Sequence, residues 1–233
     1  MYSTFTPVAG RSPLDMTFTP DTTQRYPLMT MADGVDPFFG YGRFVYGKAA
    51  AAMNVGRLCT VGFDGTMTEV ANAVGVGIPL FVARQTFSNA SEWGWYQCFG
   101  LAPIQTANSV AIGTGFGIAA AGKGGTIGNG KQIVNASVVK ASTYAPTKAG
   151  CILRLGADIK RIRVPNTEGL FPGLAVTGTG VGASAVIVTV NANGNEITVD
   201  VDSTAAGTVT LTFTWTNFLM VMLNNPFGQG QIV

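Results

Sequence analysis

The sequence predicts an all-β protein: a barrel-like or sandwich-like main domain and a second, small antiparallel β module that an immunoglobulin-like sandwich would fit. Charged residues make up only 11% of the 233 residues, compared with about a quarter in an average globular protein. Glycine is abundant, with 31 residues. The clearest pattern runs from Thr208 to Thr216, where threonine alternates with other, mostly apolar residues as in a half-buried strand.

Residues 1–38 are predicted to form an extended N-terminal arm. Their prolines lack a backbone donor and fix φ, which excludes a long helix or a central strand. The segment also holds too many large apolar side chains for a solvated tail, and this favours docking on a neighbouring surface over disorder. The residues expected to contact that surface are Phe5, Phe18, Tyr26, Leu28, Met29 and Phe38.

Residues 39–163 are predicted to form the main β domain. Asp64-Gly65 indicates a hairpin turn, and Ile78 to Ala83 indicates a strand that begins near a proline. The run from Trp93 to Ala102 contains two of the three tryptophans. Aromatic residues bury the most apolar surface, so this strand is expected to anchor the core. The predicted core anchors are Trp93, Trp95 and Phe99.

Residues 164–216 are predicted to form the small β module. Val186 to Val190 and Ile197 to Val201 are expected to pair across Asn193-Gly194. The continuous apolar run from Phe218 to Leu223 is typical of a strand buried on both faces. We expect residues 217–233 to return to the main domain, which would make the small module an insertion.

No catalytic constellation emerges, and the sequence predicts that the protein is not an enzyme and needs no cofactor. Histidine is absent, and the twelve carboxylates are scattered. The segment from Gly125 to Lys131 begins like a phosphate-binding loop, but Gln132 replaces the required Ser or Thr and no helix is expected after it. The three cysteines are far apart and are expected to be buried apolar residues rather than disulfide or zinc ligands: Cys59, Cys98 and Cys151.

Neither nucleic acid nor a membrane is an expected partner. Lys160, Arg161 and Arg163 are the only local basic cluster, without a wider basic stripe. Asp200 and Asp202 are interpreted as a polar strand face rather than a cation site. No apolar run approaches the roughly 18 residues of a membrane helix. The N-terminus lacks a secretory signal pattern, so synthesis in a cytoplasm is expected. The net charge of only +2 suggests a surface largely covered by partners.

Two stretches resemble the capsid decoration, or cement, proteins of tailed bacteriophages. They are the run from Gly77 to Ala83 and the run from Trp93 to Ala102, and the resemblance covers roughly residues 20–140. The segments from Gly173 to Gly180 and from Asn195 to Val199 are similar to a small β module found in phage head and fibre proteins. Trp93, Cys98 and the long module that follows depart from the decoration-protein pattern.

The resemblance implies a structural virion protein that binds the outer surface of an icosahedral capsid and stabilises the shell. Its partners would be the major capsid protein and further copies of itself, as a trimer or a dimer, on the capsid exterior. The alternative is a tail-fibre or adhesin-like module that binds a host glycan, with Trp93, Trp95 and Tyr96 as an exposed sugar platform. An enzyme that uses aspartate or lysine is a third, weaker alternative.

Overall fold

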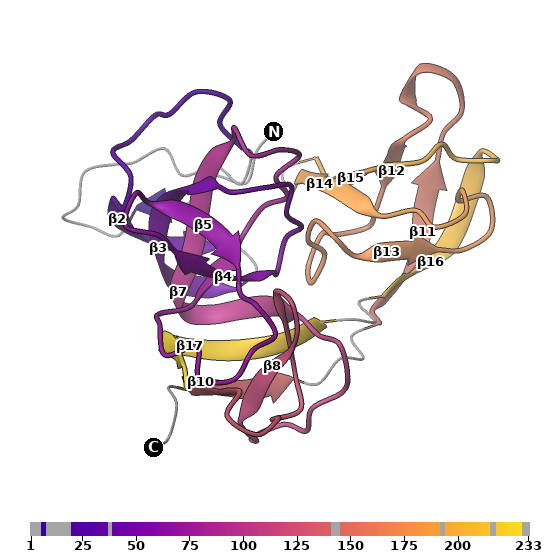
Figure 1. Ribbon diagram of the computed structural model, residues 1–233. Coiled ribbons are helices and arrows are strands. Elements are labelled where there is room, and N and C mark those ends of the chain that lie inside the picture. Colours follow the sequence, from indigo (N-terminus) through magenta and orange to yellow (C-terminus); the bar gives the residue numbers. More distant parts are fainter. Residues whose placement is uncertain are drawn as a thin grey trace. The chain divides into compact units, whose positions relative to one another are not determined.

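The computed structural model describes residues 6–7, 20–36, 39–140, 145–191, 194–214 and 218–229. The all-β prediction is confirmed: the one helical element among these residues is the 3-10 turn η1 (Gly156–Asp158). Residues 4–142 with 217–233 form a larger compact unit, and residues 143–216 form a smaller one (Figure 1). No helix in the described ranges is long and apolar enough to cross a membrane.

Eleven strands in the described part of the larger unit form one sheet, in the order β1-β2-β3-β5-β4-β6-β7-β17-β10-β8-β9. Their bounds are β1 Thr6–Pro7, β2 Met31–Asp36, β3 Gly40–Ala49, β4 Leu58–Val61, β5 Thr66–Glu69, β6 Phe81–Ala83, β7 Trp93–Gln105, β8 Phe116–Ala120, β9 Lys123–Gly125, β10 Gln132–Lys140 and β17 Phe218–Gly228. The predicted hairpin at Asp64-Gly65 is the antiparallel pair β4–β5.

Five of these strands close into a ring. β3 pairs in parallel with β5 and antiparallel with β7, and β4 and β6 complete the ring between them. Strand side chains alternate between the two faces, so each strand sends every second residue into a shared cluster. Within this cluster the rings of Phe87 and Tyr96 stack at a centroid distance of 5.2 Å. The buried members are Val45, Ala49, Met53, Cys59, Met67, Phe81, Ala83, Phe87, Tyr96 and Cys98.

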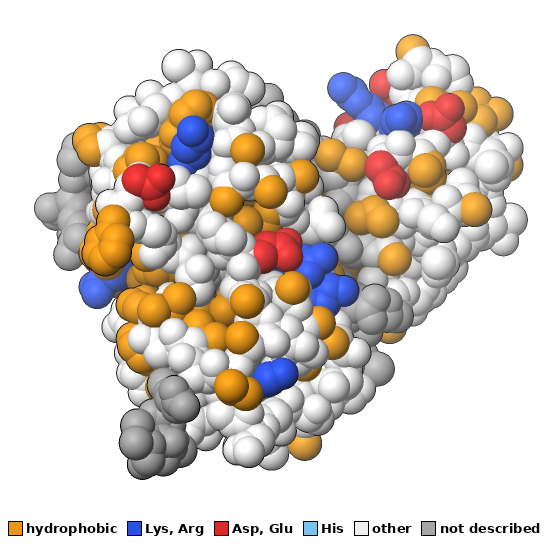
Figure 2. All heavy atoms as spheres, in the orientation of Figure 1, with side chains coloured by type: hydrophobic (Ala, Val, Ile, Leu, Met, Phe, Trp, Pro, Cys, Tyr) orange, Lys and Arg blue, Asp and Glu red, His pale blue; other side chains and the backbone are white. Residues whose placement is uncertain are grey.

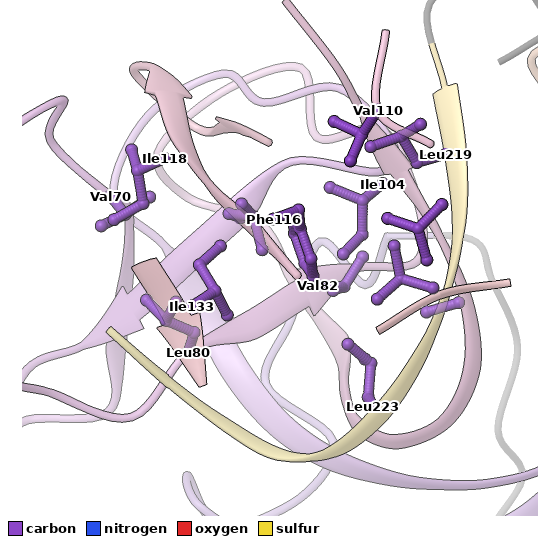
Figure 3. Close-up of a cluster of buried hydrophobic side chains, with 14 residues drawn as sticks. Val70, Leu80, Val82, Ile104, Val110, Phe116, Ile118, Ile133, Leu219 and Leu223 are labelled. Atoms are coloured by element: carbon purple, nitrogen blue, oxygen red, sulfur yellow. The ribbon is translucent and has the colours of Figure 1, made fainter. Parts of the chain in front are cut away.

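A second cluster is built from side chains of β4, β6, β7, β8, β10 and β17 and of the loops near them (Figure 3). The alternate residues Leu219, Val221 and Leu223 of β17 point into it. Phe116 of β8 and Ile104 of β7 are fully buried there. β17 is therefore a central strand, with β7 and β10 as its two neighbours.

The smaller unit is a nearly closed six-stranded antiparallel barrel in the order β13-β16-β11-β12-β15-β14. Its strands are β11 Thr147–Leu153, β12 Arg161–Arg163, β13 Ala175–Thr177, β14 Ile187–Asn191, β15 Glu196–Val199 and β16 Gly207–Thr214. The Val176 N–H donates to the Ala185 carbonyl at 2.8 Å, and the Ile187 N–H donates to the Leu174 carbonyl at 2.9 Å. These bonds join the two ends of the sheet. In β16, Leu211 and Phe213 are buried while the threonines alternate with them, as the sequence pattern predicts.

The predicted start of the small module at residue 164 is wrong. β11 and β12 precede that position, yet they pair with β16 and β15 of the smaller unit. The physical reason is that Cys151, Leu153 and Ile162 supply buried side chains to the barrel. The chain leaves the larger unit after β10 and re-enters it at β17.

The prediction that residues 1–38 form a separate arm is wrong for residues 20–36. β2 pairs with β3 along its length, and Asp21 forms an isolated bridge with Trp93. The Met29 N–H donates to the Tyr46 carbonyl at 2.8 Å. Pro20 and Pro27 stand outside the regular strands, so the missing donors disturb no ladder. Phe5, Phe18 and Phe38 lie outside the described residues.

Candidate interaction surface

One face of strand β17 carries large apolar side chains that the larger unit does not bury. Leu219, Val221 and Leu223 point into the core, whereas Met220 is half-buried and Met222 is 44% exposed. The prediction that this strand is buried on both faces is wrong. Solvated strand faces normally carry polar residues. The unbroken apolar run therefore indicates that the second face of β17 is suited to burial by a partner.

The strand register extends this face across the sheet. Met222 pairs with Leu101 of β7. Val35 of β2 pairs with Tyr41 of β3, and the ring of Tyr41 meets that of Phe99 edge-on at a centroid distance of 6.0 Å. Directly paired residues point to the same side of a sheet. We name these six residues the outer apolar face: Val35, Tyr41, Phe99, Leu101, Met220 and Met222.

The outer apolar face spans four strands and is partly open to solvent. Val35 is 40% exposed and Tyr41 is 43% exposed, close to the value for Met222. Phe99 and Leu101 are half-buried between them. Connected apolar surface of this kind is characteristic of sites where a protein meets a partner.

Charges lie at the borders of this face. Arg43 pairs with Phe99 across the sheet, and its guanidinium forms an ion pair with Asp33 at 2.8 Å. This hydrogen bond and the Asp33 charge raise the pKa of Arg43, so the guanidinium stays charged. At the opposite border Lys140 pairs with Met220. An apolar partner surface with a polar rim fits this arrangement.

The three predicted core anchors have three different positions. Trp95 is 1% exposed and is a core residue. Trp93 is only partly buried, with the Lys48 ammonium 5.6 Å from its ring centroid. Phe99 is not a core anchor. The register shift opposite Cys98 is the reason, because it turns Phe99 to the outer side of β7.

The predicted sugar platform is not accessible. Trp95 and Tyr96 are at most 1% exposed, and the indole nitrogen of Trp93 is also buried. Stacking of a sugar on all three rings is therefore excluded.

Two of the predicted arm residues pack on their own subunit. The ring of Tyr26 lies 5.2 Å from that of Tyr46 and 5.5 Å from that of Trp95. Leu28 packs against the same aromatic cluster. Both side chains are only partly buried by these contacts, so their assignment to an intersubunit contact stays a prediction. Met29 is 42% exposed and accessible.

The other motifs have structural explanations. Lys131 leads directly into strand β10 instead of a helix, so the phosphate-loop geometry is missing. Arg161 lies 3.7 Å from Asp158 and 3.9 Å from Glu196, and Lys160 lies 3.9 Å from Asp202. Charged side chains of both signs gather at one end of the smaller unit (Figure 2). No group of three metal-ligating side chains occurs in the ranges that the structure describes.

Comparisons with protein-family models, curated proteins and solved structures give no match. The outer apolar face therefore stands on its geometry alone. The sequence signal that could have located it is the apolar character of both faces of β17, combined with Tyr41 and Val35 in the neighbouring strands.

The three cysteines are buried and unpaired. Burial raises the pKa of the Cys98 thiol to about 11 and raises the pKa of Cys59 and Cys151 as well. The thiolate is the reactive form, so we expect the folded protein to resist a thiol reagent at about pH 8, while the denatured protein exposes all three groups. Reaction of the folded protein at the rate of the denatured one would contradict the burial.

Proposed function

We propose that this chain is a non-enzymatic structural protein of a tailed-phage virion, which binds the outer surface of the icosahedral capsid and stabilises the shell. The outer apolar face carries this proposal. It offers a preformed surface of four strands, and burial of partly exposed side chains such as Met222 supplies binding free energy in proportion to the area removed from water.

The distribution of charge on the larger unit supports the same function. Several of its charged groups are already paired within the subunit, including Arg84 with Asp36 and Arg57 with Glu69. Figure 2 shows hydrophobic side chains spread over the visible face of this unit, with a few charged ones among them. A surface of this composition gains little from ion pairs and more from burial against a large partner.

If the outer apolar face contacts the shell, Met222→Asp should weaken shell binding without lowering the stability of the protein. A carboxylate that faces an apolar partner must be desolvated, and we expect binding to empty shells to weaken by at least about tenfold, or roughly 1.4 kcal/mol. The measurement is cosedimentation of purified protein with shells that lack it. Because the contact is apolar, the affinity of the unmodified protein should vary little with salt.

Val188→Asp is the matched control, because Val188 is 51% exposed on β14 of the smaller unit. It introduces the same charge at an apolar surface position outside the outer apolar face. Both variants should melt close to the unmodified protein. Shell binding by Met222→Asp at the unmodified level would exclude this face as the contact.

A further inference from the structure

The turn between β4 and β5 holds one aromatic side chain entirely in solvent. Phe63 has a relative exposure of 115%, so its ring makes no burying contact with its own chain. A position at the tip of a turn is ordinarily occupied by a polar residue or glycine. Phe63 therefore presents a complete apolar side chain to solvent.

The turn that carries Phe63 is rigid. The Gly62 N–H donates to the Thr66 carbonyl at 2.8 Å, and the Thr66 N–H donates to Asp64 Oδ1 at 3.0 Å. Gly65 has φ +75°, and its Cα lies so close to Leu28 that a Cβ there would be 2.7 Å from the Leu28 Cβ. A rigid turn lowers the entropy lost when its side chain is bound.

The same unit contains an open pocket lined by two apolar side chains together with polar side chains and glycine backbone. Its volume is about 510 Å³, and Val74 and Ile127 in its lining are 64% and 49% exposed. The Gly75 N–H donates to the Gly130 carbonyl at 2.9 Å and joins the two loops that form it. The lining residues are Val74, Gly75, Ile127, Gly128, Asn129, Gly130 and Gln229. A volume of about 510 Å³ leaves room for a phenylalanine side chain.

Charges beside the two features have opposite signs. Asp64 follows Phe63, and its hydrogen bonds with Thr66 lower the pKa of its carboxyl, so it is ionised at neutral pH. Lys131 follows Gly130 at the pocket and donates to Asn72 Oδ1 at 2.9 Å. The Lys131 side chain lies beside Gly128 of the lining, where a Cβ would be 3.4 Å from the Lys131 Cδ. The pocket and the Phe63 turn therefore carry charges that attract each other.

We propose that the pocket formed by Val74 and Ile127 receives Phe63 of a second copy of this chain. The two surfaces are different, so the contact is heterologous and each copy can be donor and acceptor at once. Repetition of such a contact produces a ring if it closes and a filament if it does not. This proposal does not depend on capsid binding.

A single Phe63 contact is weak by itself. One aromatic side chain buries about 150–250 Å², whereas a stable pair of proteins buries about 800 Å² on each partner. Ring closure, or a surface that concentrates the copies, would raise the occupancy of the contact. The test must therefore trap a weak complex.

Photocrosslinking provides this test. Phe63 is replaced by benzoyl-phenylalanine, which keeps the aromatic anchor and inserts into nearby C–H bonds when it is irradiated. We expect covalent dimers whose crosslinked peptide contains Val74 or Ile127. The same probe at Tyr41, which is 43% exposed on the outer apolar face, is the control and should not label this peptide.

A mixing experiment tests the heterologous geometry. The probe-bearing chain with Ile127→Asp should lose about tenfold in dimer yield when it is irradiated alone. Addition of chain with an intact pocket should restore crosslinking, and the label should appear only on the added copy. Absence of dimers, labels elsewhere, or a yield that is insensitive to Ile127→Asp would overturn the proposal.

Discussion

Replacement of Trp95 by alanine is expected to destabilise the protein by about 3–5 kcal/mol, the cost of removing a large aromatic side chain from a packed core. Trp95 is 1% exposed, and its ring lies 5.2 Å from that of Tyr46 and 5.5 Å from that of Tyr26. The cavity would therefore lie between β3, β7 and the segment before β2. Chemical denaturation with tryptophan fluorescence or circular dichroism measures the loss.

Trp93→Ala is the matched control for this prediction. Trp93 is two residues away on the same strand but only partly buried, so its replacement should cost clearly less than that of Trp95. Near-native unfolding midpoints for both variants would contradict the assignment of Trp95 as a core anchor.

Replacement of Asp36 by alanine is also expected to cost about 3–5 kcal/mol, because it leaves a buried cation without its carboxylate. The Arg84 Nη2 atom lies 2.8 Å from Asp36 Oδ2, and the two side chains are 3% and 2% exposed. Burial lowers the pKa of Arg84, while the Asp36 charge opposes this shift. Gln97 accepts a hydrogen bond from the same guanidinium. Denaturant unfolding measures the change.

Asp158→Ala is the control for the buried pair. Asp158 pairs with Arg161 at 3.7 Å, with side-chain exposures of 46% and 57%. An exposed pair of this kind contributes about 1 kcal/mol or less. We also expect Asp36→Leu combined with Arg84→Met to be less damaging than Asp36→Ala alone, since no unpaired charge remains. Equal losses for Asp36→Ala and Asp158→Ala would show that burial of the pair has no special cost.

The fold could be predicted where local patterns determine it. The alternation in β16 and the Asp64-Gly65 turn each specify a strand or a hairpin without distant information. The boundary of the smaller unit could not be predicted, because only pairing with β16 and β15 assigns β11 and β12 to the barrel. Whether residues 20–36 extend as an arm or pack on the larger unit likewise depends on which surface their apolar side chains contact.

The outer apolar face could not be predicted for the same reason, because it depends on contacts between strands that are distant in the sequence. An apolar run such as Phe218 to Leu223 shows that both strand faces are apolar, but it does not show which face its own chain covers. Phe99 illustrates a further difficulty, since a single register shift opposite Cys98 reverses the side to which it points. Phe63 is indistinguishable from a core phenylalanine in the sequence, and only its exposure identifies it as a protruding side chain.

Electron cryomicroscopy of purified virions tests the proposed binding to the shell. We expect many copies of this chain at equivalent positions over the outside of the shell, with Leu101, Tyr41 and Met222 of the outer apolar face turned toward the capsid protein. A few copies confined to the tail, or copies on the shell whose outer apolar face is turned to solvent, would contradict it.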